Sequence, residues 1–138
     1  MNIEQAHNLS RSFVVAFERC MENRPLPNGQ FQWPVAPSVV CAAFSIEIGF
    51  KAIILSEGGS AAGHELAKLF GKISASTKSL IINETGLNSQ AFKAALELMS
   101  NAFTEWRYIY EKDNAHIDLE FLKRLLYATQ NAAVQVKK

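Results

Sequence analysis

The chain has 138 residues, of which 49% are hydrophobic and 20% are charged, and its formal net charge is +1. This length suits one domain with a core of its own, and we expect residues 1–138 to form a single domain. A nearly neutral charge excludes a protein that grips a phosphate backbone through a large basic excess. Any contact with nucleic acid must therefore be local, or must be spread over an oligomer.

Cys20 and Cys41 are the two cysteines, and they fall on different predicted helices. No CxxC spacing is present, so we expect two reduced thiols that serve as small hydrophobic side chains. No uninterrupted apolar run reaches the ~18 residues of a membrane span. The polar N-terminal stretch does not resemble a signal peptide. The expectation is a cytoplasmic protein without membrane association.

Apolar residues recur at a spacing near 3.6 along most of the chain, which predicts an all-α fold. The first helix is expected over about residues 3–23, with Leu9 in its buried stripe and His7 on its solvated side. Residues 24–37 contain prolines and an Asn-Gly pair, which indicates a loop. This loop is interpreted either as an ordered cap over one end of the bundle or as a binding loop.

The remaining helices follow the same periodicity. They are expected over about residues 38–56, 64–73, 89–111 and 118–136. Leu80–Ile82 is compatible with a strand, but a helical turn is favoured because no partner strand is evident. Four long helices and one short helix predict an up-and-down four-helix bundle with an additional short helix.

Glu47 and Lys51 lie in an unusual position on the second helix. At 100° per residue they fall near the middle of an apolar arc that covers more than half of the helix circumference. They are four residues apart, so they are neighbours on one face in the favourable Glu-then-Lys order. A carboxylate in such a place must be paired or hydrogen-bonded. The pair is either a structural link between helices or part of a polar pocket or subunit interface.

The fourth helix ends with the stretch Trp106–Glu111 (WRYIYE), in which Tyr110 is expected to face the core. Arg107 flanks the apolar stripe and has two candidate partners, Glu111 within the helix and Glu47 across the bundle. One interpretation is a structural Arg–Glu network. The other is an anion or phosphate site, because arginine beside aromatic side chains suits both phosphate binding and base stacking.

His64 is expected to open the third helix, where a neutral imidazole serves either as a helix cap or as an acid–base group. His116 follows the fourth helix. The histidines are scattered, so no spacing matches a metal site. No Walker-type glycine loop is present either. The sequence therefore predicts neither a bound metal nor a cofactor.

Three stretches, in this order and at this spacing, form a recognisable set. They are Ala43–Glu47 with Lys51-Ala52, Gly63–Leu66 with Leu69-Phe70, and Arg107–Glu111 followed by Ile117-Asp118. Over about residues 39–126 the chain resembles the HEPN superfamily, whose members are small helical bundles that bind or cleave nucleic acid. The resemblance implies a homodimer, a setting in phage defence, toxin–antitoxin or RNA-related systems, and a nucleotidyltransferase-like protein as a candidate partner.

Many HEPN proteins are metal-independent ribonucleases that carry an arginine and, after a short spacer, a histidine. Counted from Arg107, the positions expected for that histidine hold Lys112, Asp113 and Asn114, and His116 comes later. Members without the pair are binders of RNA, nucleotides or partner proteins, and this chain resembles that group more closely.

The expected function is therefore binding of RNA or a nucleotide. The cleft is expected to be lined by Arg107, Tyr110, His64 and Lys51, with Glu47 and Glu111 orienting the basic groups. One alternative is a metal-independent endoribonuclease that acts as a homodimer, in which Arg107 stabilises charge on the phosphate and His64 or His116 moves the proton. The other alternative is a non-catalytic protein-interaction bundle in which these side chains only hold helices together.

Overall fold

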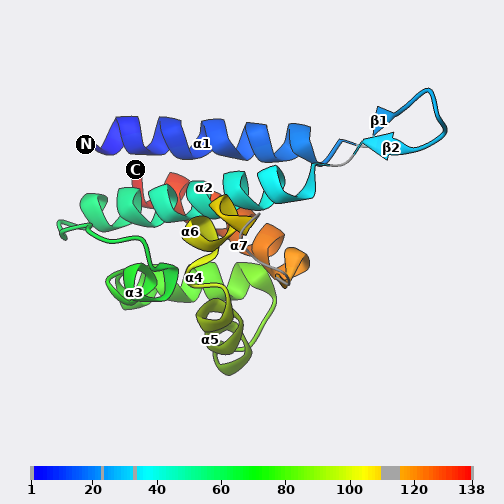
Figure 1. The fold of residues 1–138 in the computed structure, drawn as a ribbon. Coiled ribbons are helices and arrows are strands. Elements are labelled where there is room, and N and C mark those ends of the chain that lie inside the picture. The colour runs from blue at the N-terminus through cyan, green and yellow to red at the C-terminus, as the bar shows by residue number, and fades with distance from the viewer. Residues whose placement is uncertain (1, 23, 33, 110–115, 138) are drawn as a thin grey trace.

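The computed structural model describes residues 2–22, 24–32, 34–109 and 116–137. The described residues form helices and one short hairpin, so the predicted all-α bundle is confirmed (Figure 1). The elements are α1 Ile3–Cys20, β1 Arg24–Pro25, β2 Phe31–Gln32, α2 Val35–Ser56, α3 Leu66–Gly71, α4 Ala75–Thr85, α5 Ser89–Leu98, α6 Ala102–Arg107 and α7 Leu119–Lys137.

The antiparallel pair α1 and α2 is joined by the β1–β2 hairpin, which projects beyond the bundle (Figure 1). Arg24 pairs with Gln32 and Pro25 with Phe31, and residues 26–30 form the exposed tip. Gly29 in this tip has φ +84°, a conformation that glycine adopts without strain. The hairpin extends away from the helices, so it does not form the expected cap over the end of the bundle.

Helix α2 is central, because it contacts α1, α3, α6 and α7. Its length and composition are those of a helix that could cross a membrane. The sequence did not predict this property because Glu47 and Lys51 interrupt the apolar run. However, 78% of the relevant stretch is buried inside the structure, so α2 packs as the core helix of this bundle.

Small polar residues line a close crossing of α1, α2 and α7. Ser10 Oγ donates to Ser45 O at 2.8 Å, and Ser45 Oγ donates to Ser10 O at 2.7 Å. Gln130 Nε2 of α7 donates to Ser10 Oγ at 2.6 Å. A Cβ atom at Gly49 would lie 2.7 Å from Thr129 Cγ2. The three helices therefore approach one another where no larger side chain separates them.

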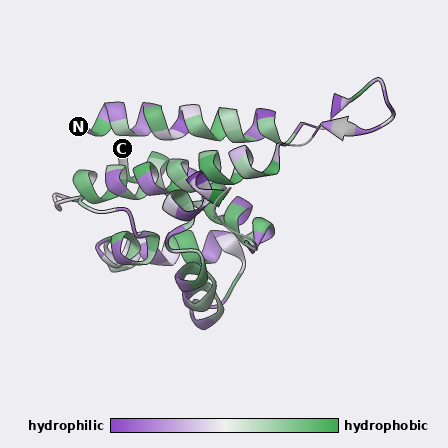
Figure 2. Cartoon of the chain, in the orientation of Figure 1, coloured by the Kyte–Doolittle hydropathy of each residue, from purple (hydrophilic) through white to green (hydrophobic). Residues whose placement is uncertain are grey.

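This crossing changes the buried face predicted for α1. His7 is 6% exposed and Leu9 is 40% exposed, the reverse of the expectation. His7, Ser10 and Val14 are three and four residues apart and form one buried face. Figure 2 shows hydrophobic and hydrophilic residues intermixed around α1, so hydropathy alone does not define the face that packs.

Leu80–Ile82 lies inside α4, so the helical interpretation of this segment is confirmed and extended to a full helix. Ser74 is the N-cap, and its side chain accepts a hydrogen bond from Thr77 N. Gly86, with φ +77°, ends the helix.

The long helix predicted over residues 89–111 is divided into α5 and α6. Ser100 lies between them, and its carbonyl oxygen accepts from Leu66 N while its Oγ accepts from Ala67 N, both at 2.9 Å. These two N–H groups begin α3, which has no side-chain cap of its own. The break between α5 and α6 thus supplies hydrogen-bond acceptors for the first N–H groups of α3.

Candidate functional site

A charged cluster is formed by Glu47 and Lys51 of α2 and by His64 of the segment that follows this helix. Glu47 Oε2 accepts from Lys51 Nζ at 3.2 Å and lies 3.0 Å from His64 Nδ1. The side chains of Glu47 and Lys51 are 1% and 11% exposed, whereas that of His64 is 63% exposed. In the neutral tautomer in which Nδ1 donates to the carboxylate, Nε2 is the acceptor. Among the described residues this nitrogen has no partner.

Local structure explains the cluster. Glu47 and Lys51 are one turn apart on α2, as their spacing predicted. Gly63, at φ +98°, allows the chain after α2 to turn so that His64 returns to the helix. The N-cap of α3 is Glu65 rather than His64. The imidazole contacts the carboxylate instead, so of the two roles expected for His64 the helix cap is wrong.

The other carboxylate oxygen of Glu47, Oε1, differs from Oε2 in its hydrogen bonding. Glu47 Oε1 is buried and has no hydrogen-bond partner in the described part of the chain. Burying such an oxygen without a partner costs free energy. The cluster also involves one helix and the segment after it, so these described contacts do not link two helices.

Arg107, the predicted anion-binding residue, lies elsewhere on the bundle. Its guanidinium carbon is 4.6 Å from the ring centroid of Phe103 and 5.3 Å from that of Tyr108. Phe103 stacks on Phe44 of α2 at 4.6 Å between centroids, and Phe44 meets Phe13 of α1 edge-on at 4.7 Å. A ladder of three phenylalanine rings thus supports the guanidinium.

The Arg107 hollow is a shallow depression of about 600 Å³ beside this ladder. Its lining is mainly apolar and comes from the first turns of α2 and the end of α6. The lining residues are Ala36, Pro37, Val40, Cys41, Trp106, Arg107, Tyr108 and Ile109. Arg107 is exposed there and forms no ion pair with any carboxylate that the structure describes.

Cys41 lines the Arg107 hollow with a thiol that is not activated. Burial raises the pKa of Cys41, and the neighbouring Cys20, through its charge and a side-chain hydrogen bond, raises it further. A thiol with a raised pKa stays protonated near neutral pH and is a poor nucleophile. Both cysteines are free and half-buried, which agrees with their interpretation as small apolar side chains.

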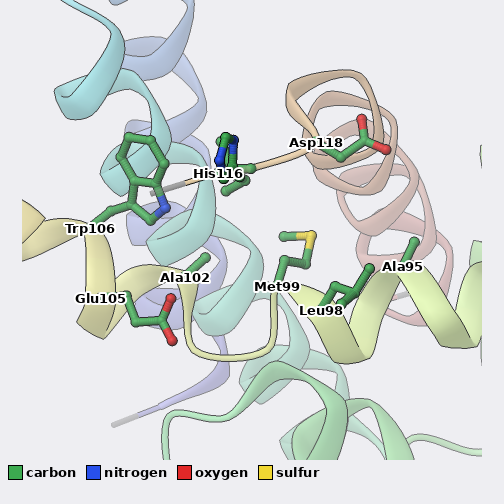
Figure 3. Close-up of a pocket in the computed structure, with 9 residues that line it drawn as sticks. Ala95, Leu98, Met99, Ala102, Glu105, Trp106, His116 and Asp118 are labelled. Atoms are coloured by element: carbon green, nitrogen blue, oxygen red, sulfur yellow. The ribbon is translucent and has the colours of Figure 1, made fainter. Parts of the chain in front are cut away.

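His116 lines a different cavity of about 430 Å³, shown in Figure 3. Trp106 and Glu105 line this cavity from α6, and Leu98 of α5 and the following residue, Met99, also line it. Trp106 also lines the Arg107 hollow, so this residue contributes to both depressions. His116 lies outside a helix, in the segment before α7.

The predicted site residues therefore occupy three places. Glu47, Lys51 and His64 form one cluster, Arg107 lies over the aromatic ladder, and His116 lines a separate cavity. In the described part of the chain Glu47 pairs with Lys51 and His64 and not with Arg107. Tyr110 and Glu111 lie outside the described residues.

Sequence reasoning missed the ladder that supports Arg107. Phe103 and Arg107 are four residues apart, a spacing that places them on one helix face. That signal was available in the sequence. The stacking of Phe103 on Phe44 was not, because it depends on how α6 packs against α2.

No group of three or more His, Cys, Asp or Glu side chains in the described ranges is arranged to hold a metal ion. In comparisons with known proteins, no family model, curated protein or solved structure matches the chain. The functional argument therefore depends on the chemistry of the site residues themselves.

Proposed function

We propose that this chain is a HEPN-like helical domain that binds RNA or a nucleotide through the Arg107 hollow. The observation that carries the proposal is an exposed guanidinium, stacked on Phe103 and without a described carboxylate partner, at the edge of an apolar depression. A guanidinium in this state can form bidentate hydrogen bonds with a phosphate.

The rest of the hollow suits a base. Trp106 and Tyr108 are among its lining residues, and aromatic side chains stack on bases of any sequence. Val40 and Pro37 add apolar surface. A local arrangement of this kind is also compatible with a net charge of only +1. As part of the same proposal, the domain is cytoplasmic, acts as a homodimer in a defence or RNA-related system, and has a nucleotidyltransferase-like protein as a candidate partner.

The test measures fluorescence anisotropy of a labelled single-stranded RNA with the wild type, Arg107→Ala and Arg107→Lys. Loss of a charge-assisted contact should weaken binding roughly tenfold in Arg107→Ala. Arg107→Lys should retain part of the affinity, because it keeps the charge but not the fork geometry. Arg11→Ala is the matched control, since Arg11 is an exposed arginine on α1. Equal affinity of Arg107→Ala and the wild type would remove this hollow from consideration.

The Glu47–His64 contact favours a second candidate, a metal-independent endoribonuclease. A buried carboxylate that holds Nδ1 of an exposed imidazole orients Nε2 as a proton acceptor. Arg107 lines a hollow at the first turns of α2, whereas His64 contacts Glu47 farther along this helix. A site that uses both residues would combine Arg107 of one copy with His64 of another. This arrangement requires the homodimer.

This candidate is tested by incubating mixed RNAs without added metal at several pH values. Arg107→Ala and His64→Ala should each be inactive, and mixing the two proteins should restore part of the cleavage if the site is shared between copies. RNA that stays intact with the wild type would reject the nuclease. Cleavage that persists when both His64 and His116 are replaced by alanine would also reject it.

A further inference from the structure

A cleft of about 400 Å³ lies between α3, α4 and α5, on elements that do not line the Arg107 hollow. Its apolar lining includes Phe70, Ile82, Phe92 and Leu96. The rings of Phe70 and Phe92 are 4.9 Å apart between centroids, tilted by 45°. A cavity of this size and lining suits a small apolar ligand with an aromatic or aliphatic body.

The charges at this cleft favour an anion. Lys78 of α4 and Lys93 of α5 both line it, and neither forms an ion pair with a carboxylate in the described ranges. Lys78 is half-buried, with Nζ 5.9 Å from the centroid of Phe70. Glu97, one turn beyond Lys93 on the same helix, also lines the cleft. The two lysines outnumber this single carboxylate, so the lining carries a net positive charge.

We propose that this cleft binds a small aromatic carboxylate. The aromatic body would lie against Phe70 and Phe92, and the carboxylate would lie beside Lys78 and Lys93. The apolar rings supply surface to bury, and the two ammonium groups select an acid over its neutral analogue. This site is independent of the proposed nucleic-acid surface, because the two share no lining residue.

Gly71 allows the cleft to be filled without disturbing the fold. It lines the cleft at the end of α3, and a Cβ atom built there meets nothing within 4 Å. Its φ is not in the left-handed region, so a larger residue causes no backbone strain. Gly71→Leu should therefore occupy the space that the ligand needs while the helices keep their positions.

The experiment compares binding of 1-naphthaleneacetate and of the neutral 1-naphthaleneacetamide by isothermal titration calorimetry. The wild type should bind the acid about fivefold more tightly than the amide. The double variant Lys78→Met/Lys93→Met should bind the two equally, and Gly71→Leu should bind neither. Lys72→Met is the matched control, since Lys72 is exposed and does not line the cleft. Arg107→Ala should bind the acid like the wild type.

Wild-type protein that binds neither compound, or both with equal affinity, would overturn the proposal. Retained binding in Gly71→Leu would overturn it as well. Circular dichroism of Gly71→Leu verifies its helix content, and if this variant does not fold, the double lysine variant decides the outcome. Weaker RNA binding in Arg107→Ala has no bearing on these results, so failure of either proposal can be recognised separately.

Discussion

Glu47 and Lys51 place two opposite charges in the middle of an apolar helix, so the stability of the fold is sensitive to substitution of either residue. Their side chains are almost entirely removed from solvent, and Lys51 Nζ has Glu47 Oε2 as its described hydrogen-bond acceptor. A buried pair of this kind adds little net stability compared with apolar residues of the same size. Removing one member is costly, because the remaining charge then lacks its partner.

Glu47→Ala should therefore lower the free energy of unfolding by about 3 kcal/mol, measured by urea denaturation. Glu65→Ala is the matched control, because Glu65 pairs with the exposed Lys68 at 3.3 Å. That change should cost less than about 1 kcal/mol. Equal effects of the two substitutions would mean that the charges on α2 are hydrated in solution.

Glu57 gives a stability change that depends on pH. Burial favours the neutral acid, but hydrogen bonds from Ser74 Oγ, Ser74 N and Thr77 Oγ1 outweigh it, so the pKa of Glu57 lies below its ordinary value. A depressed carboxyl pKa stabilises the fold above the unfolded-state pKa, and this contribution is lost as pH falls through the folded-state pKa.

The melting temperature of the wild type should accordingly fall more steeply than that of Glu57→Gln between about pH 5 and pH 3. At neutral pH the wild type should be the more stable of the two. Parallel melting curves over this pH range would show that the carboxylate does not prefer its charged form in the folded protein.

At the scale of helices, the close crossing of α1, α2 and α7 depends on the absence of a side chain at Gly49. A methyl group there would lie 2.7 Å from Thr129 Cγ2 and 3.2 Å from Ser10 Oγ. Both neighbours are side chains that hold hydrogen bonds within the packed helices, so making room requires these side chains or their helices to shift. The steric cost exceeds the roughly 1 kcal/mol that alanine gains over glycine within a helix.

Gly49→Ala should therefore destabilise the protein by about 1–3 kcal/mol in urea denaturation. Gly71→Ala offers the opposite case, because nothing lies within 4 Å of the added methyl group. It should be neutral or slightly stabilising. A stabilising effect of Gly49→Ala would mean that the three helices are farther apart than the structure indicates.

Periodicity predicted the existence of most helices, but it could not predict their interruptions. The division between α5 and α6 depends on Ser100 binding the first N–H groups of α3, a contact between residues 33 positions apart. The buried face of α1 depends on Ser10 and Ser45, whose polarity suggests solvent exposure when the sequence is considered alone. In both cases a tertiary hydrogen bond overrides the local pattern.

The candidate site residues also divide into contacts that local helix geometry predicts and contacts that depend on tertiary packing. Glu47 and Lys51 could be paired from the sequence, since their contact lies within one turn of a helix. The contact of His64 with Glu47 spans 17 residues and depends on the turn at Gly63. The position of Arg107 over Phe103 follows helical spacing, but its distance from the charged cluster depends on how α6 packs on α2.

At the scale of the whole molecule, the β1–β2 hairpin is separable from the bundle. Residues 26–30 are exposed, and the described backbone hydrogen bonds of Leu26 and Gly29 are local to the tip. Pro25 and Phe31 are opposite one another in the hairpin, so a two-residue turn can connect them.

Replacing residues 26–30 by Asn-Gly should therefore change the melting temperature by less than about 3 °C, since few contacts are lost and the loop becomes shorter. The variant should also bind RNA like the wild type if the Arg107 hollow is the binding surface. Loss of RNA affinity without loss of stability would instead support the interpretation of this segment as a binding loop.

The central position of α2 has a consequence for synthesis on the ribosome. This helix is completed at Ser56, whereas α7, which covers part of it, begins only at Leu119. Until α7 emerges, the part of α2 that it covers has no native cover, and such apolar surfaces attract chaperones or aggregate. Nascent chains stalled before Leu119 should therefore engage chaperones more strongly than nascent chains that already include α7.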